Sequence, residues 1–303
     1  MQDLSDQTLV KEACTRGLGW GMDHAWPDVE VDHYGNVVPT EYNFPPYMQW
    51  ACGAGELGPW MYFDPDVDFE EYMRSVRSSL ALIINCFGPL MMAGLGFSIG
   101  SHRNLHVDSL EPRTRNGFEY ADEPHLDVVA CGPGGLVVID PTCIDYLAPK
   151  RPRITEHSET LTEEGVTDAW AAEMLRIQNG EQSYRLLDAE HLIERALSVS
   201  RSNPDEPATL VYLYWEPMDE GLSQLFREHR QEIAEFGKRV AGSSLRFEAL
   251  SWFELWNDWA ETGDPLLQRQ VAELRARYEV PAWAWEGVCW VDGRLTNSGL
   301  EDW

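Results

Sequence analysis

The stretch LDVVACGPGGLVVIDPT, residues 126–142, decides the fold prediction. It holds two short apolar runs, Leu126–Ala130 and Leu136–Asp140, on either side of the tetrapeptide Gly132–Gly135. Short runs rich in β-branched residues and bounded by glycine and proline are typical of strands, and a short Gly/Pro-rich connection between them predicts a β-hairpin. Both runs are apolar enough to lie in a buried sheet, and each carries one aspartate.

Those two aspartates, Asp127 and Asp140, are the first candidates for a functional site. A buried carboxylate costs several kcal/mol unless it is paired or binds a cation. Two carboxylates on adjacent strands can meet at one edge of the sheet and hold Mg²⁺, which prefers oxygen ligands. The alternative is structural, because an aspartate at the end of a strand also caps turns or pairs with arginine.

The remainder of the chain alternates between helical and strand-like patterns, which predicts an α/β fold. We expect helices over 70–86, 167–178, 187–200, 221–241 and 265–278 and a strand over 209–215. Asp188 is a plausible cap for the third of these helices. Residues 1–60 are rich in proline, glycine and aromatic residues and predict an irregular N-terminal extension, before a core domain over 61–280 and a C-terminal tail over 281–303 that packs on the core.

The segment from Ser78 to Ser101 carries no formal charge over 24 residues. Its length alone is compatible with a membrane span. Because Asn85 and the Gly88-Pro89 pair interrupt it, we favour a turn at Gly88-Pro89 between two buried pieces over a membrane helix.

Charge and cysteine usage narrow the functional classes. With 51 Asp and Glu against 23 Lys and Arg, the formal net charge is −28, so the overall field repels nucleic acid and anionic membranes. The six cysteines include no CxxC pair, which favours free thiols in a reducing compartment. The N-terminal residues show no secretory signal, and we expect a cytoplasmic protein with no membrane association. Gly-x-Ser-x-Gly elbows and P-loops are also absent from the sequence.

The hairpin and its flanks resemble a known superfamily. Residues 124–147 are similar to the hairpin of PD-(D/E)XK nucleases, and in particular to a restriction-endonuclease-like branch with a pattern close to LDVV, a Gly-Pro turn, ESK and Tyr-Leu. Further blocks resemble the same branch in the same order, and these blocks are 55–57, 78–81, 184–189, 210–217, 228–230 and 250–256. The resemblance covers residues 45–280 and implies a restriction-endonuclease-like central mixed sheet flanked by helices.

The resemblance also assigns roles, position by position. Asp127 takes the place of the metal-binding aspartate, and Asp140 takes the place of the second acidic residue. A weaker candidate is Glu56, which can add a carboxylate from the first-helix region or can be an ordinary exposed glutamate beside glycine. These residues would hold Mg²⁺ or Mn²⁺ for phosphodiester hydrolysis. The catalytic lysine, however, is replaced by Thr142, which follows Pro141. A hydroxyl carries no charge and cannot supply the electrostatic stabilisation that a lysine gives to the reacting phosphate.

Three interpretations remain open. In the first, the site is intact and another residue supplies the cation; Lys150 is the catalytic candidate, beside Arg151, Arg153 and Arg185. In the second, the site binds metal and turns over slowly. In the third, catalysis is lost. We favour impaired or lost nuclease activity, with DNA or a protein as partner and no small-molecule cofactor. The alternative is a non-catalytic interaction or structural protein of the same fold with no role on nucleic acids.

Two weaker candidates lie near this motif. His125 is two positions before Asp127 and therefore points to the same face of the strand. It can contact the metal or a phosphate, but we favour the alternative of a structural histidine at the sheet edge. His191 and Arg195 are one helical turn apart, which is compatible with a phosphate clamp or with an ordinary solvated helix face.

Overall fold

A six-stranded mixed sheet forms the centre of the molecule. The computed structural model describes residues 2–25, 30–31, 37–38, 75–110, 126–148, 169–202, 207–218, 224–280, 288–291 and 294–297. The strands follow the order β3 (Phe97–Ile99), β4 (His102–Leu110), β5 (Val128–Gly132), β6 (Gly135–Thr142), β7 (Ala208–Tyr214) and β8 (Arg246–Ser251). The pairs from β3 to β6 are antiparallel, and β6, β7 and β8 run parallel to one another. The fold is therefore the mixed α/β fold that the sequence predicts.

The predicted hairpin is confirmed as β5 and β6. Val128 pairs with Ile139 at one end of the ladder, and Gly132 pairs with Gly135 at the turn. Gly135 has a φ of +106°, a conformation that side chains with a β-carbon rarely adopt. The position of this glycine thus fixes where β6 begins and sets the register that places the two aspartates.

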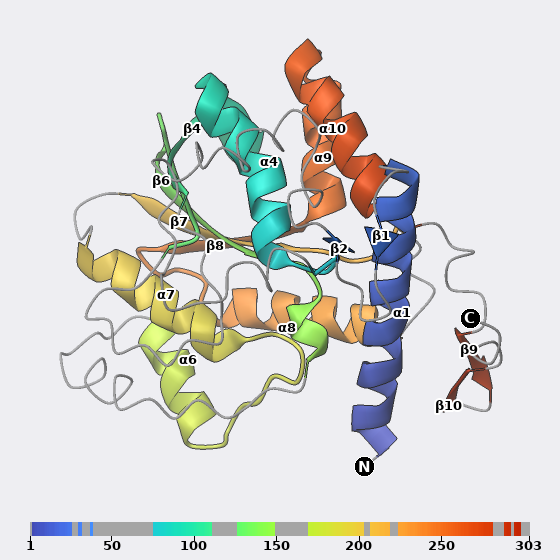
Figure 1. Ribbon diagram of the computed structural model, residues 1–303. Helices are drawn as coiled ribbons and strands as arrows, with labels where there is room; N and C mark the ends of the chain where they lie inside the picture. The colour runs from blue at the N-terminus through green and yellow to red at the C-terminus, as the bar shows by residue number, and fades with distance from the viewer. Residues whose placement is uncertain are drawn as a thin grey trace.

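Helices cover both faces of the sheet (Figure 1). One face carries α4 (Ser79–Ala93), α9 (Trp252–Glu261) and α10 (Pro265–Tyr278), and the other carries α6 (Ala169–Gln178), α7 (Ala189–Ser202) and α8 (Gln224–Arg239). Alternate residues of each central strand point to opposite faces. Val137 and Ile139 accordingly join the core on the α4 side, while Val138 joins a second core formed with α6, α7 and α8. Asp140, two residues after Val138, lies on the side of this second core.

The predicted turn at Gly88-Pro89 is wrong, because both residues lie inside α4. The helix begins at Ser79 rather than at residue 70, with Ser78 as its N-cap, and it ends at Ala93, with Gly94 as its C-cap. Proline leaves the carbonyl four residues earlier without its helical N–H partner. Here that carbonyl belongs to Asn85, and it accepts a hydrogen bond of 3.3 Å from the side-chain amide of Gln270 in α10. A neighbouring helix therefore supplies the donor that Pro89 lacks.

The prediction of an irregular N-terminus is also wrong for α1 (Gln2–Ala25), a helix of 24 residues. The helix packs along α10 and touches the 3-10 turn η2 (Asp145–Leu147). The two helices approach closely because a β-carbon at Gly21 would clash with the main-chain carbonyl of Arg277. The buried guanidinium of Arg277 also donates to the carbonyl of Leu18 at 3.0 Å and to that of Val76 at 2.9 Å.

Two small hairpins complete the described elements. They are β1 (Glu30–Val31) with β2 (Val37–Val38), and β9 (Val288–Val291) with β10 (Arg294–Asn297). The central sheet is curled, since Glu248 of β8 accepts a 3.0 Å hydrogen bond from the backbone N–H of Ser101, which connects β3 to β4. Among the helices that the structure describes, none is both long and apolar enough to cross a bilayer.

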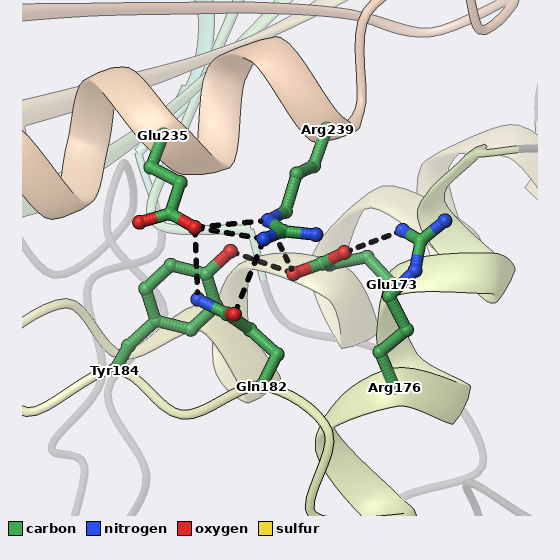
Figure 2. A network of polar contacts seen from close by, with 6 residues as sticks. All are labelled: Glu173, Arg176, Gln182, Tyr184, Glu235 and Arg239. Carbon is green, nitrogen blue, oxygen red and sulfur yellow. Dashed lines mark hydrogen bonds and ion pairs between the residues drawn. The ribbon is translucent and has the colours of Figure 1, made fainter.

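A polar network joins α6 to α8 (Figure 2). The fully buried Glu173 accepts hydrogen bonds from Tyr184 at 2.6 Å and from Arg176 at 2.8 Å, and it lies 3.7 Å from Arg239. Burial, followed by the hydrogen bond to Glu173, raises the pKa of the Tyr184 phenol. The network holds the segment that leads into α7 against the helices beside it.

Candidate functional site

The antiparallel register brings the two motif aspartates together. Because Val128 pairs with Ile139, the next position outward places Asp127, which directly precedes β5, opposite Asp140 of β6. Directly opposed residues of an antiparallel pair project from the same face of the sheet. Both residues are buried, with 6% of Asp127 and 2% of Asp140 exposed. The sequence prediction that these residues meet at one edge of the sheet is thereby supported by the geometry.

Helix α7 delivers two further side chains to the same place. Nε2 of His191 lies 2.9 Å from Oδ1 of Asp140. One turn later, Nη2 of Arg195 lies 3.4 Å from Oδ2 of Asp127, and its Nε lies 3.9 Å from Oδ1 of Asp140. His191 and Arg195 are nearly buried, so the interpretation of this pair as a solvated helix face is wrong. The guanidinium bridges the two carboxylates.

Nε2 of His191 has two polar neighbours. It lies 2.9 Å from Oδ1 of Asp140, a contact whose donor depends on the tautomer of the imidazole. Nε of Arg195 lies 3.3 Å from the same nitrogen and donates to it in the tautomer that leaves Nε2 without a hydrogen. The imidazole and the guanidinium therefore both approach Asp140, and the guanidinium also reaches Asp127.

The segment before α7 is fixed by one acidic side chain of α8. The carboxylate of Glu232 accepts three backbone hydrogen bonds, from Arg185 at 2.7 Å, Leu186 at 2.8 Å and Leu187 at 2.7 Å. Consecutive backbone N–H groups that converge on an anion form a nest, here occupied by the protein's own carboxylate. The side chain of Asp188 accepts from the backbone N–H of His191 at 3.4 Å, as expected for the predicted helix cap. These contacts set the orientation with which α7 presents His191 and Arg195.

Thr142 lies at the end of β6 and is fully buried. Its main-chain carbonyl accepts from the backbone N–H of Trp215 at 3.0 Å and from the indole of Trp252 at 3.1 Å. Its side-chain oxygen Oγ1 has no hydrogen-bond partner among the described residues. The position that holds lysine in the motif thus supplies no charge to the site.

Aromatic side chains of the next strand border the aspartates. In the parallel register of β6 and β7, Tyr212 aligns with Asp140 and Tyr214 with Thr142. The hydroxyl of Tyr212 lies 3.1 Å from Nε2 of the fully buried His229, whose ring stacks on Tyr146 with 3.9 Å between centroids. Burial raises the pKa of the Tyr146 phenol well above its ordinary value. Buried aromatic side chains therefore line this part of the site.

Several predicted site residues fall elsewhere. Glu56, His125 and Lys150 lie outside the described residues, as do Arg151 and Arg153. Arg185 pairs with Glu228 of α8 at 3.2 Å. Among the described residues, Arg195 is the cation that contacts both aspartates. The sequence named it only together with His191, as a weak candidate. The signal that could have found it is the helical spacing of that pair together with two strand aspartates in need of a counter-ion.

A divalent cation does not fit this arrangement as it stands. Asp127 and Asp140 have suitable ligand chemistry, because Mg²⁺ and Mn²⁺ prefer carboxylate oxygens. Oδ2 of Asp127, however, already contacts Arg195, and Oδ1 of Asp140 already contacts His191. Within the described part of the chain, no group of three or more His, Cys, Asp or Glu residues is arranged as a metal site.

Comparison with known proteins identifies the family. A family described as Restriction Endonuclease associating with ARP matches residues 61–279, which include the whole hairpin and the helix that carries His191 and Arg195. Comparisons with curated proteins and with solved structures find no match. The match extends over more than half of the chain and agrees with the mixed sheet described above. The chain therefore belongs to the family of restriction endonucleases associating with ARP, and its relationship to PD-(D/E)XK nucleases is that of a restriction-endonuclease-like fold.

Proposed function

We propose that this chain is a nuclease-fold protein that acts together with an ARP partner protein and whose metal-dependent phosphodiester hydrolysis is impaired or lost. The observation that carries the proposal is Thr142, which stands at the position of the motif lysine and is fully buried. Its side chain offers no positive charge to a reacting phosphate, and such charge is the main contribution of that position to catalysis.

The carboxylates support the same proposal. A divalent cation held by Asp127 and Asp140 would activate water and neutralise charge on a phosphoryl oxygen. Because Arg195 and His191 already contact these carboxylates, we assign no catalytic step to such an ion. What the residues themselves do in this arrangement is balance charge and tie α7 to the β5–β6 hairpin.

The partner is proposed from the family description, which names association with ARP. A protein partner also agrees with the net charge of −28, because a field of that sign repels the phosphate backbone of DNA at long range. The same charge favours the second candidate, an interaction or structural protein of this fold with no role on nucleic acids. DNA as a ligand then requires either the partner or a local basic surface.

A nuclease assay tests the catalytic part of the proposal. Supercoiled plasmid and single-stranded DNA are incubated with Mg²⁺ or Mn²⁺ and the full chain, with and without the ARP protein, beside Asp127→Ala and Asp140→Asn. We expect the wild type to cleave no faster than the two variants. Cleavage by the wild type that both variants lose would contradict impaired catalysis.

Copurification and DNA retention test the partner part. We expect the full chain and the ARP protein to elute together in size-exclusion chromatography, and separate elution at micromolar concentration contradicts the association. Retention of DNA by the complex at low salt then decides against the second candidate, whereas a complex that leaves DNA unbound supports it.

A further inference from the structure

Two buried carboxylates that face each other need a positive charge close by. Like charges at short range in a poorly solvated site oppose the ionisation of both groups unless a cation compensates them. In PD-(D/E)XK-type chemistry that cation would be a metal ion; at Asp127 and Asp140 it is the guanidinium of Arg195, 3.4 Å from one carboxylate and 3.9 Å from the other.

Arg195 is held in this position by the fold. Three residues of α7 are buried in the core beneath the sheet, and these are Leu192, Ala196 and Val199. The helix is therefore packed against the core both before and after Arg195. The three backbone hydrogen bonds to Glu232 fix the entry to the same helix. Only 12% of the Arg195 side chain is exposed, and its Nη1 atom is buried with no hydrogen-bond partner among the described residues.

From this geometry we infer that Arg195 is a built-in counter-ion that closes the Asp127–Asp140 pair to divalent cations. A metal ion that used both carboxylates would stand next to the guanidinium, and two cations in a site of low polarity repel each other strongly. Occupation by Mg²⁺ or Mn²⁺ and the Arg195 contacts are therefore mutually exclusive. For the choice of ion this role of Arg195 rests on the proposed function. It adds to that function the residue that excludes the ion.

The test measures Mn²⁺ binding rather than activity. Mn²⁺ is titrated into the full chain and followed by the electron paramagnetic resonance signal of the free ion, for wild type, Arg195→Gln and the double variant Arg195→Gln/Asp127→Asn. We expect Arg195→Gln to bind one Mn²⁺ about tenfold or more tightly than wild type, and the double variant to lose that gain. Equal affinity in wild type and Arg195→Gln would overturn the inference.

A matched control separates this effect from a general loss of positive charge. Arg176→Gln removes an arginine that also pairs with a buried acid, Glu173, at 2.8 Å. We expect no change in Mn²⁺ binding from that variant, and a gain equal to that of Arg195→Gln would contradict a specific role for Arg195.

A second arm uses the wild-type background, in case Arg195→Gln does not fold. Asp127→Asn should leave Mn²⁺ binding unchanged, because a closed pair has no binding to lose, and a marked loss would contradict the inference. The outcomes also separate the two proposals. A wild type that binds Mn²⁺ at Asp127 without cleaving DNA removes this inference alone, whereas a wild type that excludes Mn²⁺ and still cleaves DNA removes the proposed function alone.

Discussion

At the scale of single residues, the site is organised by which side chains reach Asp127 and Asp140. Nε2 of His191 lies 2.9 Å from Oδ1 of Asp140, and Arg195 spans both carboxylates. Thr142, two residues beyond Asp140 and therefore on the same face of β6, adds only a hydroxyl. The positive charge in this site thus comes from Arg195 of α7, whereas Thr142, at the strand position that carries lysine in the motif, is neutral.

Thr142→Val tests whether that hydroxyl has any role. Its oxygen is buried without a hydrogen-bond partner among the described residues, so replacing it with a methyl group of similar size removes a desolvation cost. We expect the free energy of unfolding in urea to rise by about 1 kcal/mol. Thr262→Val is the matched control, since Thr262 donates to the carbonyl of Trp259 at 2.8 Å and its loss should lower the free energy of unfolding by a similar amount. A destabilised Thr142→Val would indicate that the hydroxyl has a partner in solution.

The sequence predicts half of this site. Asp127 and Asp140 could be placed side by side because strand punctuation at the Gly-Pro turn sets the hairpin register. The roles of His191 and Arg195 could not be assigned, because a helix 51 residues beyond Asp140 reaches it only through tertiary packing. Spacing of four residues is equally common on solvated helix faces.

At the scale of elements, α4 shows how a neighbouring helix overrides a local signal. Gly88-Pro89 predicts a turn, but the segment is buried on nearly all sides and remains helical. Gln270, itself 5% exposed, donates to the carbonyl of Asn85, four residues before Pro89, and its amide also contacts the carbonyl of Cys86. Propensity rules describe an isolated segment and cannot include a donor that comes from a helix 181 residues away.

The Gln270 contact can be tested by a double-mutant cycle. Gln270→Leu removes the side-chain donor of the buried Asn85 carbonyl and should lower the free energy of unfolding by about 2 kcal/mol. In a Pro89→Ala background the new backbone N–H can serve that carbonyl, so we expect the same substitution to cost about 1 kcal/mol less. The exposed Gln268→Leu serves as the control on the same helix. Strict additivity of Gln270→Leu and Pro89→Ala would show that the amide does not compensate for the proline.

At the scale of the whole molecule, the N-terminal helix belongs to the folded domain rather than to an extension. Its buried residues Val10, Ala13, Cys14 and Leu18 follow helical spacing, but Gly17, Gly19 and Gly21 obscure that pattern in the sequence. The three glycines predict an irregular segment, because glycine is a poor helix former. At Gly17 and Gly21 the structure gives the reason for glycine, since a β-carbon would meet Val280 or Arg277.

Three wholly or partly buried tyrosines should make the folded state less stable at alkaline pH. Burial raises the pKa of Tyr146 and Tyr184, and it raises the pKa of Tyr278 to about 12. Above about pH 10 the unfolded chain loses these protons while the folded chain keeps them. The unfolded state then binds fewer protons, so the free energy of unfolding falls as the pH rises.

Tyr184→Phe should make that alkaline fall shallower. Urea unfolding at several values between about pH 9 and pH 11 measures it, with wild type and Glu173→Gln in parallel. Glu173→Gln removes the carboxylate that accepts from the phenol, and it should reduce the slope less than Tyr184→Phe does. Parallel curves for wild type and Tyr184→Phe would contradict a raised pKa at this residue.

We infer that Arg195 serves as the cation of the Asp127–Asp140 pair. The most direct measurement is a crystal structure of the full chain soaked in Mn²⁺, with data collected for the anomalous signal of manganese. We predict that the guanidinium lies between the two carboxylates, within about 4 Å of both, and that no anomalous peak lies between Asp127 and Asp140. A manganese peak ligated by both carboxylates, with the Arg195 side chain turned away, would contradict the account.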